Sequence, residues 1–257
     1  MKLNRLITGF ILGALMAAFT QASAEEDNSE QGWKFTAKAY VWGQSIGGET
    51  SSGEDVDISF SDIWENLNFA MMTWLVARNG NWLVFGDLQY ADIEGDDNTA
   101  IDPGDGMTIR GELDLEFTQW VVQTGGGYTI SKSNKHVFDV IAGVRYIHQD
   151  AEIKLDIGMP QKLKTDETAD NIDAIIGVHS LLRLNDKWYL QSYADIGTGE
   201  SDFTWQGMAS LGYQFNSFDA LFGYRHIYWD FDGNKGLGKL YKDLDFSGPQ
   251  VGAAFRF

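Results

Sequence analysis

Three arginines and three aspartates carry the clearest chemical pattern in this sequence. They are Arg145, Arg183, Arg225, Asp139, Asp173 and Asp195. Each alternates with apolar residues, and side chains two positions apart in a β-strand share one face. A guanidinium presents several donors in a fixed fork, so it suits bridging carboxylates where water is scarce. We predict that each arginine lies within salt-bridge reach of a carboxylate on this polar face, mostly Asp139, Asp173 or Asp195.

The same polar face carries other ionisable side chains. They are Lys38, Asp87, Arg110, Glu112, Asp114, Glu116 and His179. Small barrels fill their interior with side chains, and a buried ion without a partner is strongly destabilising. If the strands that carry these groups close into a narrow barrel, the groups would form an ion-pair network that plugs its lumen. The alternative is a selective solute path or a binding pocket.

A catalytic site would draw on the histidines, which are His136, His148, His179 and His226. His148 shares a face with Asp150, and His226 precedes Asp230, so a site would need one of them to converge with two acids in an extracellular cleft. That spacing is common by chance, and the sequence has no GxSxG, HExxH or phosphate-binding loop. We predict that the protein is not an enzyme, and a barrel-embedded lipid-modifying or proteolytic enzyme is the second alternative.

The acidic loop at residues 92–105 has the oxygen ligands that a divalent cation prefers. A solvated run of charge is the favoured interpretation, so we predict no metal ion and no cofactor. The chain has no cysteine, which excludes a disulfide framework and a thiolate metal site.

These side chains need strands to position them, and the clearest strands lie at residues 203–229. The sequence FTWQGMASLGYQFNSFDALFGYRHIYW alternates with a period of two on both sides of Asn216 and Ser217. One face is apolar with aromatic ends, and the other is small or polar. A soluble sandwich buries such an apolar face, whereas a transmembrane barrel turns it towards lipid.

Ten segments show this alternation. They are residues 33–44, 67–78, 82–92, 107–130, 136–157, 170–184, 188–196, 203–215, 218–229 and 241–257. Short turns near residues 80, 133, 186 and 217 alternate with longer loops at 47–66, 94–106, 158–168, 198–202 and 231–240. Outer-membrane barrels have short periplasmic turns and longer extracellular loops. We predict an all-β fold, a transmembrane antiparallel β-barrel of about ten strands, with eight or twelve as alternatives.

Four finer features follow from the pattern. The alternation changes phase near residues 118–120, which predicts a β-bulge there. Residues 47–66 should fold back on the barrel rim with a helical turn, or form an ordered surface loop. The predicted lipid-facing band contains Leu113, Phe138, Val140, Ile176, Leu190, Leu211 and Phe222. The predicted periplasmic aromatic belt contains Trp82, Trp188, Tyr213, Phe215 and Phe257.

The first 24 residues read as a secretory signal peptide. Lys2 and Arg5 precede an apolar run, and Ala22-Ser23-Ala24 is a small-residue cleavage site. Residues 25–32 form an acidic leader that we expect to be disordered, and residues 33–257 form one barrel domain. The formal net charge of −18 argues against nucleic acid as a partner.

Several segments resemble a known group of proteins. They are SFSDIWENL (59–67), AGVRY (142–146), GTGESDFTWQ (197–206), GYRH (223–226) and GPQVGAAFRF (248–257). In these segments the chain resembles a family of uncharacterised outer-membrane β-barrel proteins of Gram-negative bacteria, and the resemblance spans nearly the whole of residues 33–257. It implies a fold and a location in the bacterial outer membrane, and it implies no activity.

We therefore expect an outer-membrane barrel with a structural or surface-interaction role and a lumen largely plugged by ion pairs. A narrow channel or a binding barrel for small solutes is the first alternative. The expected partners are outer-membrane lipid and lipopolysaccharide. The barrel assembly machinery is a further expected partner, through the last strand that ends at Phe257.

Overall fold

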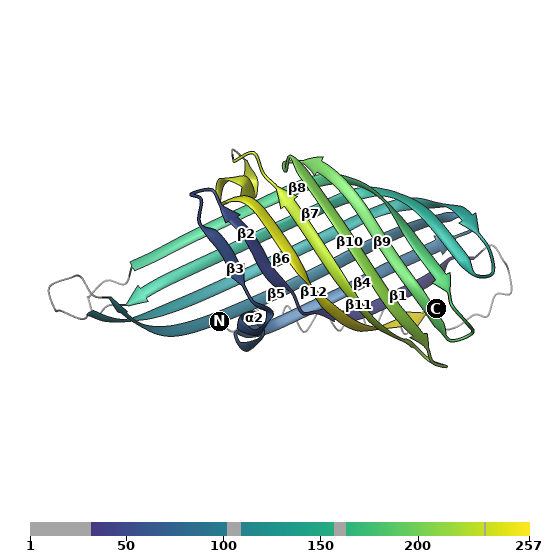
Figure 1. Cartoon of the computed structure of the whole chain (residues 1–257), viewed down its shortest axis with the longest axis horizontal. Helices are drawn as coiled ribbons and strands as arrows, with labels where there is room; N and C mark the ends of the chain where they lie inside the picture. The colour runs from purple at the N-terminus through teal and green to yellow at the C-terminus, as the bar shows by residue number, and fades with distance from the viewer. Residues whose placement is uncertain (1–31, 102–108, 157–162, 234) are drawn as a thin grey trace.

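Ten antiparallel strands close into one barrel (Figure 1). The computed structural model describes residues 32–101, 109–156, 163–233 and 235–257, with the backbone alone at 96–101, 109–115, 153, 155, 156 and 163. In order around the barrel, the strands are β1 (Lys34–Trp42), β4 (Leu67–Asn79), β5 (Trp82–Ile101), β6 (Ile109–Lys132), β7 (His136–Asp156), β8 (Leu163–Arg183), β9 (Trp188–Gly199), β10 (Phe203–Gln214), β11 (Asp219–Asp230) and β12 (Tyr241–Arg256). β1 pairs with β12, which closes the ring and confirms the predicted ten-stranded barrel.

The expected signal peptide, residues 1–24, lies outside the described residues. So does all but the last residue of the expected leader, residues 25–32.

The outer face of the barrel is apolar and exposed. Among the predicted lipid-facing residues, Phe138, Val140, Ile176, Leu190, Leu211 and Phe222 are all exposed or partly exposed. Ile176 and Phe222 are each 63% exposed, and the side chain of Leu113 is outside the description. A closed barrel pairs its backbone groups between strands and can therefore turn apolar side chains towards hydrocarbon. The chain is a transmembrane β-barrel of the bacterial outer-membrane type.

Aromatic rings form a belt at the end of the barrel that carries the short turns. The ring centroids of Trp188 and Tyr213 lie 4.8 Å apart, and those of Tyr213 and Phe215 lie 4.7 Å apart. The belt continues through Phe218 to Phe255. At the same end, Trp82 contacts Tyr128 and Phe257 pairs with the first strand. The predicted belt residues therefore share one level, which is the periplasmic interface of an outer-membrane barrel.

The barrel wall splits near the extracellular end, next to β1. β4 follows β1 only as far as Met72, opposite Tyr40. β2 (Ser45–Thr50) then continues beside β12 and pairs on its other edge with β3 (Asp55–Ile58). The short helix α2 (Phe60–Glu65) follows, capped by Ser59 and Asp62, and it buries Ile63 in the barrel interior. The segment predicted as a rim loop is therefore two strands and the expected helical turn. Among the described residues, no helix is long and apolar enough to cross a bilayer.

Four neighbouring strands extend well beyond the others. β5, β6, β7 and β8 contain 20, 24, 21 and 21 residues, whereas β9, β10 and β11 each contain 12. In Figure 1 they form the long wall that projects to the left. Most of the residues predicted as loops at 94–106 and 158–168 belong to these strands, so those loop predictions are wrong. A strand in water needs no apolar face. The alternation therefore ends where the wall leaves the membrane, although the strands continue.

The bulge predicted near residues 118–120 is also wrong. β5 and β6 pair in one register from Trp82 opposite Tyr128 to Ile101 opposite Ile109. The phase change reflects a change of surroundings, because Phe117 packs against the interior apolar cluster while Glu116 pairs with Lys154. The register shift between β6 and β7 lies between Thr129 and Ser131.

Candidate functional site

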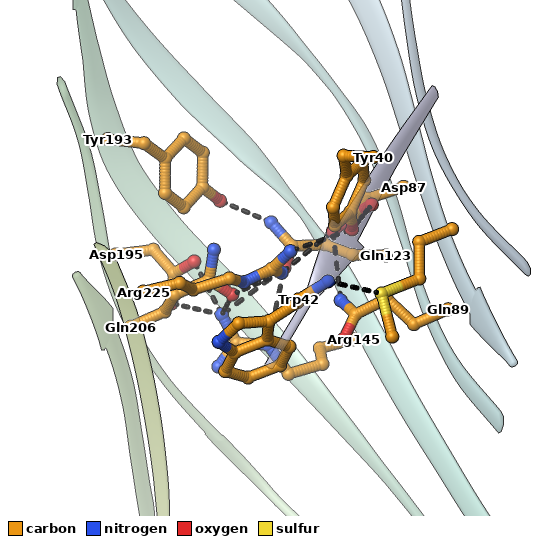
Figure 2. A network of polar contacts seen from close by, with 11 residues as sticks. Tyr40, Trp42, Asp87, Gln89, Gln123, Arg145, Tyr193, Asp195, Gln206 and Arg225 are labelled. Atoms are coloured by element: carbon orange, nitrogen blue, oxygen red, sulfur yellow. Dashed lines mark hydrogen bonds and ion pairs between the residues drawn. The ribbon is translucent and has the colours of Figure 1, made fainter. Parts of the chain in front are cut away.

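Two buried arginines occupy the middle of the barrel interior (Figure 2). Arg145 comes from β7 and Arg225 from β11, and both side chains are fully buried. The Nη2 atom of Arg145 donates to both carboxylate oxygens of Asp195, at 2.6 and 2.5 Å. Its Nη1 atom donates to the hydroxyl of Thr204 at 2.8 Å. Arg145 is thus held by an ion pair and by neutral acceptors in a site from which bulk water is excluded.

Arg225 has its own carboxylate on another strand. Its Nη2 atom lies 2.7 Å from Oδ2 of Asp87, and its Nη1 atom donates to the Tyr40 hydroxyl at 3.0 Å. Tyr40 in turn donates to Asp87 at 2.6 Å. The side-chain oxygen of Gln206 accepts from Arg145 and Arg225, each at 3.1 Å. The side-chain oxygen of Gln123, on β6, also accepts from Arg145 at 3.3 Å. One network therefore joins residues of seven strands across the lumen.

An apolar layer fills the interior on the extracellular side of this network. Its fully buried members are Val121, Ile147, Ile227, Trp229, Leu244 and Phe246. Ile147 and Ile227 are the next inward residues after Arg145 and Arg225 along their strands. The 3-10 helix η1 (Gly236–Lys239) contacts β8 and adds the fully buried Leu237. The layer and the arginine network together close the lumen.

A second polar cluster lies on the periplasmic side of the network. Asp139 is fully buried and accepts from Arg78 at 2.5 and 3.1 Å, and from the Thr129 hydroxyl at 2.6 Å. It also bonds Nδ1 of His179 at 2.9 Å. Between this polar cluster and the arginine network lies an apolar cluster of Trp74, Leu83, Phe85, Ile141, Tyr193 and Met208.

The amide of Gln191 fixes the proton on His179. The Gln191 amide nitrogen lies 2.8 Å from Nε2 of His179, and an amide nitrogen can only donate. Nε2 therefore accepts, and His179 is neutral with its proton on Nδ1, donated to Asp139. The Gln191 oxygen accepts from the Lys38 ammonium at 2.7 Å. A directional chain of hydrogen bonds thus runs from Lys38 to Asp139.

The structure brings together only some of the six residues predicted as the lumen network. Arg145 bonds Asp195, whereas Arg225 bonds Asp87, a carboxylate of the wider polar face. Asp139 takes Arg78 as its partner, an arginine absent from the prediction. Asp173 accepts from the backbone and hydroxyl of Ser201 and from Asn171.

Arg183 does not enter the interior network. It is the last residue of β8 and is exposed, and within the described parts of the chain it forms no ion pair. Strand parity gives the face of a side chain but not its depth, and at the strand end the interior opens to water. The prediction also missed Tyr40, Gln123 and Gln206. The alternation of their strands places them on the inner face, but they carry no charge and were not considered as network members.

His148 and His226, the two histidines of the candidate extracellular cleft, lie on the outer face. His148 stacks beside Tyr146, and His226 stacks on Trp205 with ring centroids 4.6 Å apart. His136 bonds Ser180 at the periplasmic end. Across the described residues there is no group of three or more His, Cys, Asp or Glu side chains able to hold a metal ion. For the acidic segment 92–105, the side chains from residue 96 onward lie outside the description.

No protein-family model and no curated protein matches the chain. Solved structures with a similar fold include the outer membrane protease OmpT from Escherichia coli, at 8% identity and a TM-score of 0.49, covering 90% of this chain and 99% of that one. Another is Ail, the attachment invasion locus protein of Yersinia pestis, at 10% identity and a TM-score of 0.37, covering 88% and 99%. A third is the translocator domain of the autotransporter NalP from Neisseria meningitidis, at 13% identity and a TM-score of 0.42, covering 99% and 97%. Likenesses of this degree carry no argument about function.

Proposed function

We propose that the protein is a closed outer-membrane barrel with a structural or surface-interaction role, and that neither ions nor solutes cross its lumen. The observation that carries the proposal is the fully buried pair of Arg145 and Arg225, covered on the extracellular side by a fully buried apolar layer. An ion entering this layer would exchange its hydration for mostly apolar side chains, which is strongly unfavourable.

The projecting wall of β5–β8 supports the surface role. These strands exceed β9–β11 by at least eight residues each, which corresponds to about 25 Å or more of additional strand. A paired wall of this size presents a large preformed surface outside the membrane. Binding of a partner to this wall would lose little conformational entropy, because strand pairing already fixes its backbone. The proposed role needs no catalytic step.

Conductance of the refolded protein in a planar bilayer tests the closed lumen. We expect no conducting steps from the wild type under conditions in which a porin control conducts. Insertion is checked in the same samples by protection of the barrel from added protease. Regular conducting steps from correctly folded wild-type protein would overturn the proposal in favour of a channel.

We further propose that outer-membrane lipid and lipopolysaccharide surround the apolar band, and that the barrel assembly machinery recognises the last strand. Phe257 lies at the periplasmic end, and its backbone pairs with that of Phe35. Deletion of Phe257 should lower the yield of assembled barrel in cells more than it lowers refolding in detergent. Equal loss in both settings would assign Phe257 to barrel stability alone.

A further inference from the structure

The periplasmic end of the barrel contains a cavity of about 170 Å³, here called the vestibule. Besides Tyr189, its ionisable lining residues are Lys38, Arg78, Lys132, His179, Asp219 and Arg256. The cavity has room for several water molecules, so a small ion with part of its hydration shell fits inside. It lies on the far side of the arginine network from the apolar layer, and the proposed closure of the lumen does not involve it.

The charges that line the vestibule do not cancel. Arg78 is paired with Asp139, and Arg256 is paired with Asp219. His179 is neutral, because its Nε2 atom accepts from Gln191. Lys38 and Lys132 have no carboxylate partner among the residues that the structure describes. Two positive charges therefore remain without compensation, in a protein whose formal net charge is −18.

Of the two lysines, Lys38 is the stronger evidence for a bound anion, because its side chain is buried. The residue is 9% exposed, and its ammonium has one hydrogen-bond acceptor in the described chain, Gln191. The ammonium also lies 5.5 Å from the ring centroid of Trp74, which supplies a cation–π contact. An ammonium has three donors, so two of them remain for a ligand. A buried cation without a counter-charge is costly, and an anion in the vestibule would offset that cost.

A β-bulge places Lys132 at the opening of the same cavity, where its side chain is exposed. Thr129 pairs with Asp139, but Ser131 pairs with Phe138 and Lys132 pairs with Val137. In an unbroken register Ser131 would stand opposite Val137, which lines the vestibule. The extra residue, Ile130, moves Lys132 into that position instead. Bulges commonly re-aim a side chain in this way.

We propose that the vestibule binds a phosphate dianion from the periplasmic side, either inorganic phosphate or the terminal phosphate of a small phosphomonoester. A dianion matches the two uncompensated charges of Lys38 and Lys132. Each guanidinium at the rim, Arg78 and Arg256, has five N–H donors and can bond a phosphate oxygen while keeping its carboxylate. This inference goes beyond the proposed closed barrel and does not depend on it.

Isothermal titration calorimetry of the refolded protein in nonionic detergent tests the site. We expect saturable one-to-one binding of inorganic phosphate. Glycerol 3-phosphate, titrated separately, shows whether a phosphomonoester also enters. Acetate at the same ionic strength should not compete, because it carries one charge. Absence of saturable binding of both phosphate ligands, or equal competition by acetate, would overturn the proposal.

Matched lysine variants locate the binding. Lys132→Gln should weaken the affinity by about tenfold, or about 1.4 kcal/mol, and Lys38→Met should abolish binding. Lys187→Gln is the control, because Lys187 is exposed at the same end but does not line the vestibule. If Lys38→Met fails to fold, Lys132→Gln decides. Unchanged affinity in Lys132→Gln, or equal weakening in Lys187→Gln, would contradict the site.

Discussion

The side-chain oxygen of Gln206 allows two arginines to share the barrel centre. It accepts from Nη2 of both Arg145 and Arg225, while each arginine keeps its own carboxylate, Asp195 or Asp87. Two like charges at this depth would repel strongly if either carboxylate were absent, because the interior screens poorly. The network is therefore sensitive to the loss of any one charged member.

Removal of Arg145 tests this sensitivity. Arg145→Ala leaves the fully buried Asp195 without its counter-charge, and we expect a loss of about 3–5 kcal/mol in the free energy of unfolding. The measurement is urea-induced unfolding in lipid vesicles, followed by tryptophan fluorescence. A loss of about 1 kcal/mol or less would indicate a hydrated lumen and would also weaken the proposal of a closed barrel.

Two further variants control this experiment. Arg183→Ala removes an exposed arginine without an ion pair in the described structure, so stability should change by no more than about 0.5 kcal/mol. The double variant Arg145→Met with Asp195→Leu removes both charges. It should recover much of the stability lost in Arg145→Ala, since replacing a whole buried pair by apolar groups is often close to neutral.

Strand parity predicted which residues face inward but not which partners they meet. Asp195 and Arg145 share the inner face as the alternation requires, yet Arg225 meets Asp87 from β5. Partner choice depends on strand stagger around the ring, which a single sequence does not specify. The apolar layer was missed for a related reason. Ile227 and Trp229 continue the inward parity of Arg225, but an apolar residue at an inward position looks like an irregularity when a polar lumen is expected.

At the scale of elements, a ladder of ion pairs crosses the projecting wall. Lys154 of β7 bonds Glu116 of β6 at 2.9 Å and Glu152 at 2.5 Å. Lys164 of β8 bonds Glu152 at 3.1 Å and Asp166 at 3.0 Å. β8 pairs with β9 only up to Asp173, so this ladder lies beyond the strands that cross the membrane. Cross-strand pairs of opposite charge favour the paired state of such a wall.

The ladder makes the wall sensitive to pH. The hydrogen bond from Lys154 and that from Lys164 hold the pKa of the Glu152 carboxyl below its ordinary 4.5. This stabilisation is fully present above pH 4.5 and is lost as the pH falls through the lowered value. Glu152 holds the pKa of Lys154 above its ordinary 10.5, and Asp166 does the same for Lys164. Their contribution is present below pH 10.5 and is lost as the pH rises through the raised values.

Amide hydrogen exchange measures this dependence. We expect protection factors near Glu152 and Lys164, corrected for intrinsic exchange rates, to be lower at about pH 3 than at about pH 7. Amides of β10, within the membrane-crossing part, provide the internal reference. Lys154→Met should lower the protection at pH 7 and reduce its pH dependence. Equal protection at both pH values in the wild type would show that the backbone pairing alone fixes the wall.

The existence of the strands was easier to predict than their lengths. Between residues 67 and 92 and between 188 and 229 an apolar face alternates with a polar one, because lipid lies on one side. Residues 94–99 have no apolar side chain in either phase of the alternation, so the pattern disappears although the backbone pairing of β5 continues to Ile101. The sequence pattern of a strand in water differs from that of a strand in lipid. A prediction based on the lipid-facing pattern therefore ends the strand too early.

At the scale of the molecule, one seam between distant parts of the chain holds the barrel closed. β1 and β12 pair over seven positions, from Thr36 opposite Arg256 to Trp42 opposite Gln250. The backbone groups of Phe35 and Phe257 exchange two hydrogen bonds, at 3.0 and 2.9 Å. The two ends of the barrel segment are thus side by side at the periplasmic end. Closure of this seam must bring together residues more than two hundred positions apart, which carries the largest loop-closure entropy in the fold.

A circular permutant tests whether this seam is an ordinary strand pair. A short glycine–serine linker joins Phe257 to Trp33, and the chain is opened between Asn79 and Gly80, in the tight turn where Gly80 has a φ of 59°. We expect the permutant to form the same barrel, because the opened turn lies at the surface and all strand pairs remain available. The measurements are far-UV circular dichroism and resistance of the folded barrel to SDS at room temperature. A control permutant with the same linker is opened between Val122 and Gln123, inside β6, and should not fold because the break interrupts the pairing with β5 and β7. Failure of the first permutant would mean that closure of β1 on β12 has requirements beyond local pairing, such as a fixed order of strand addition.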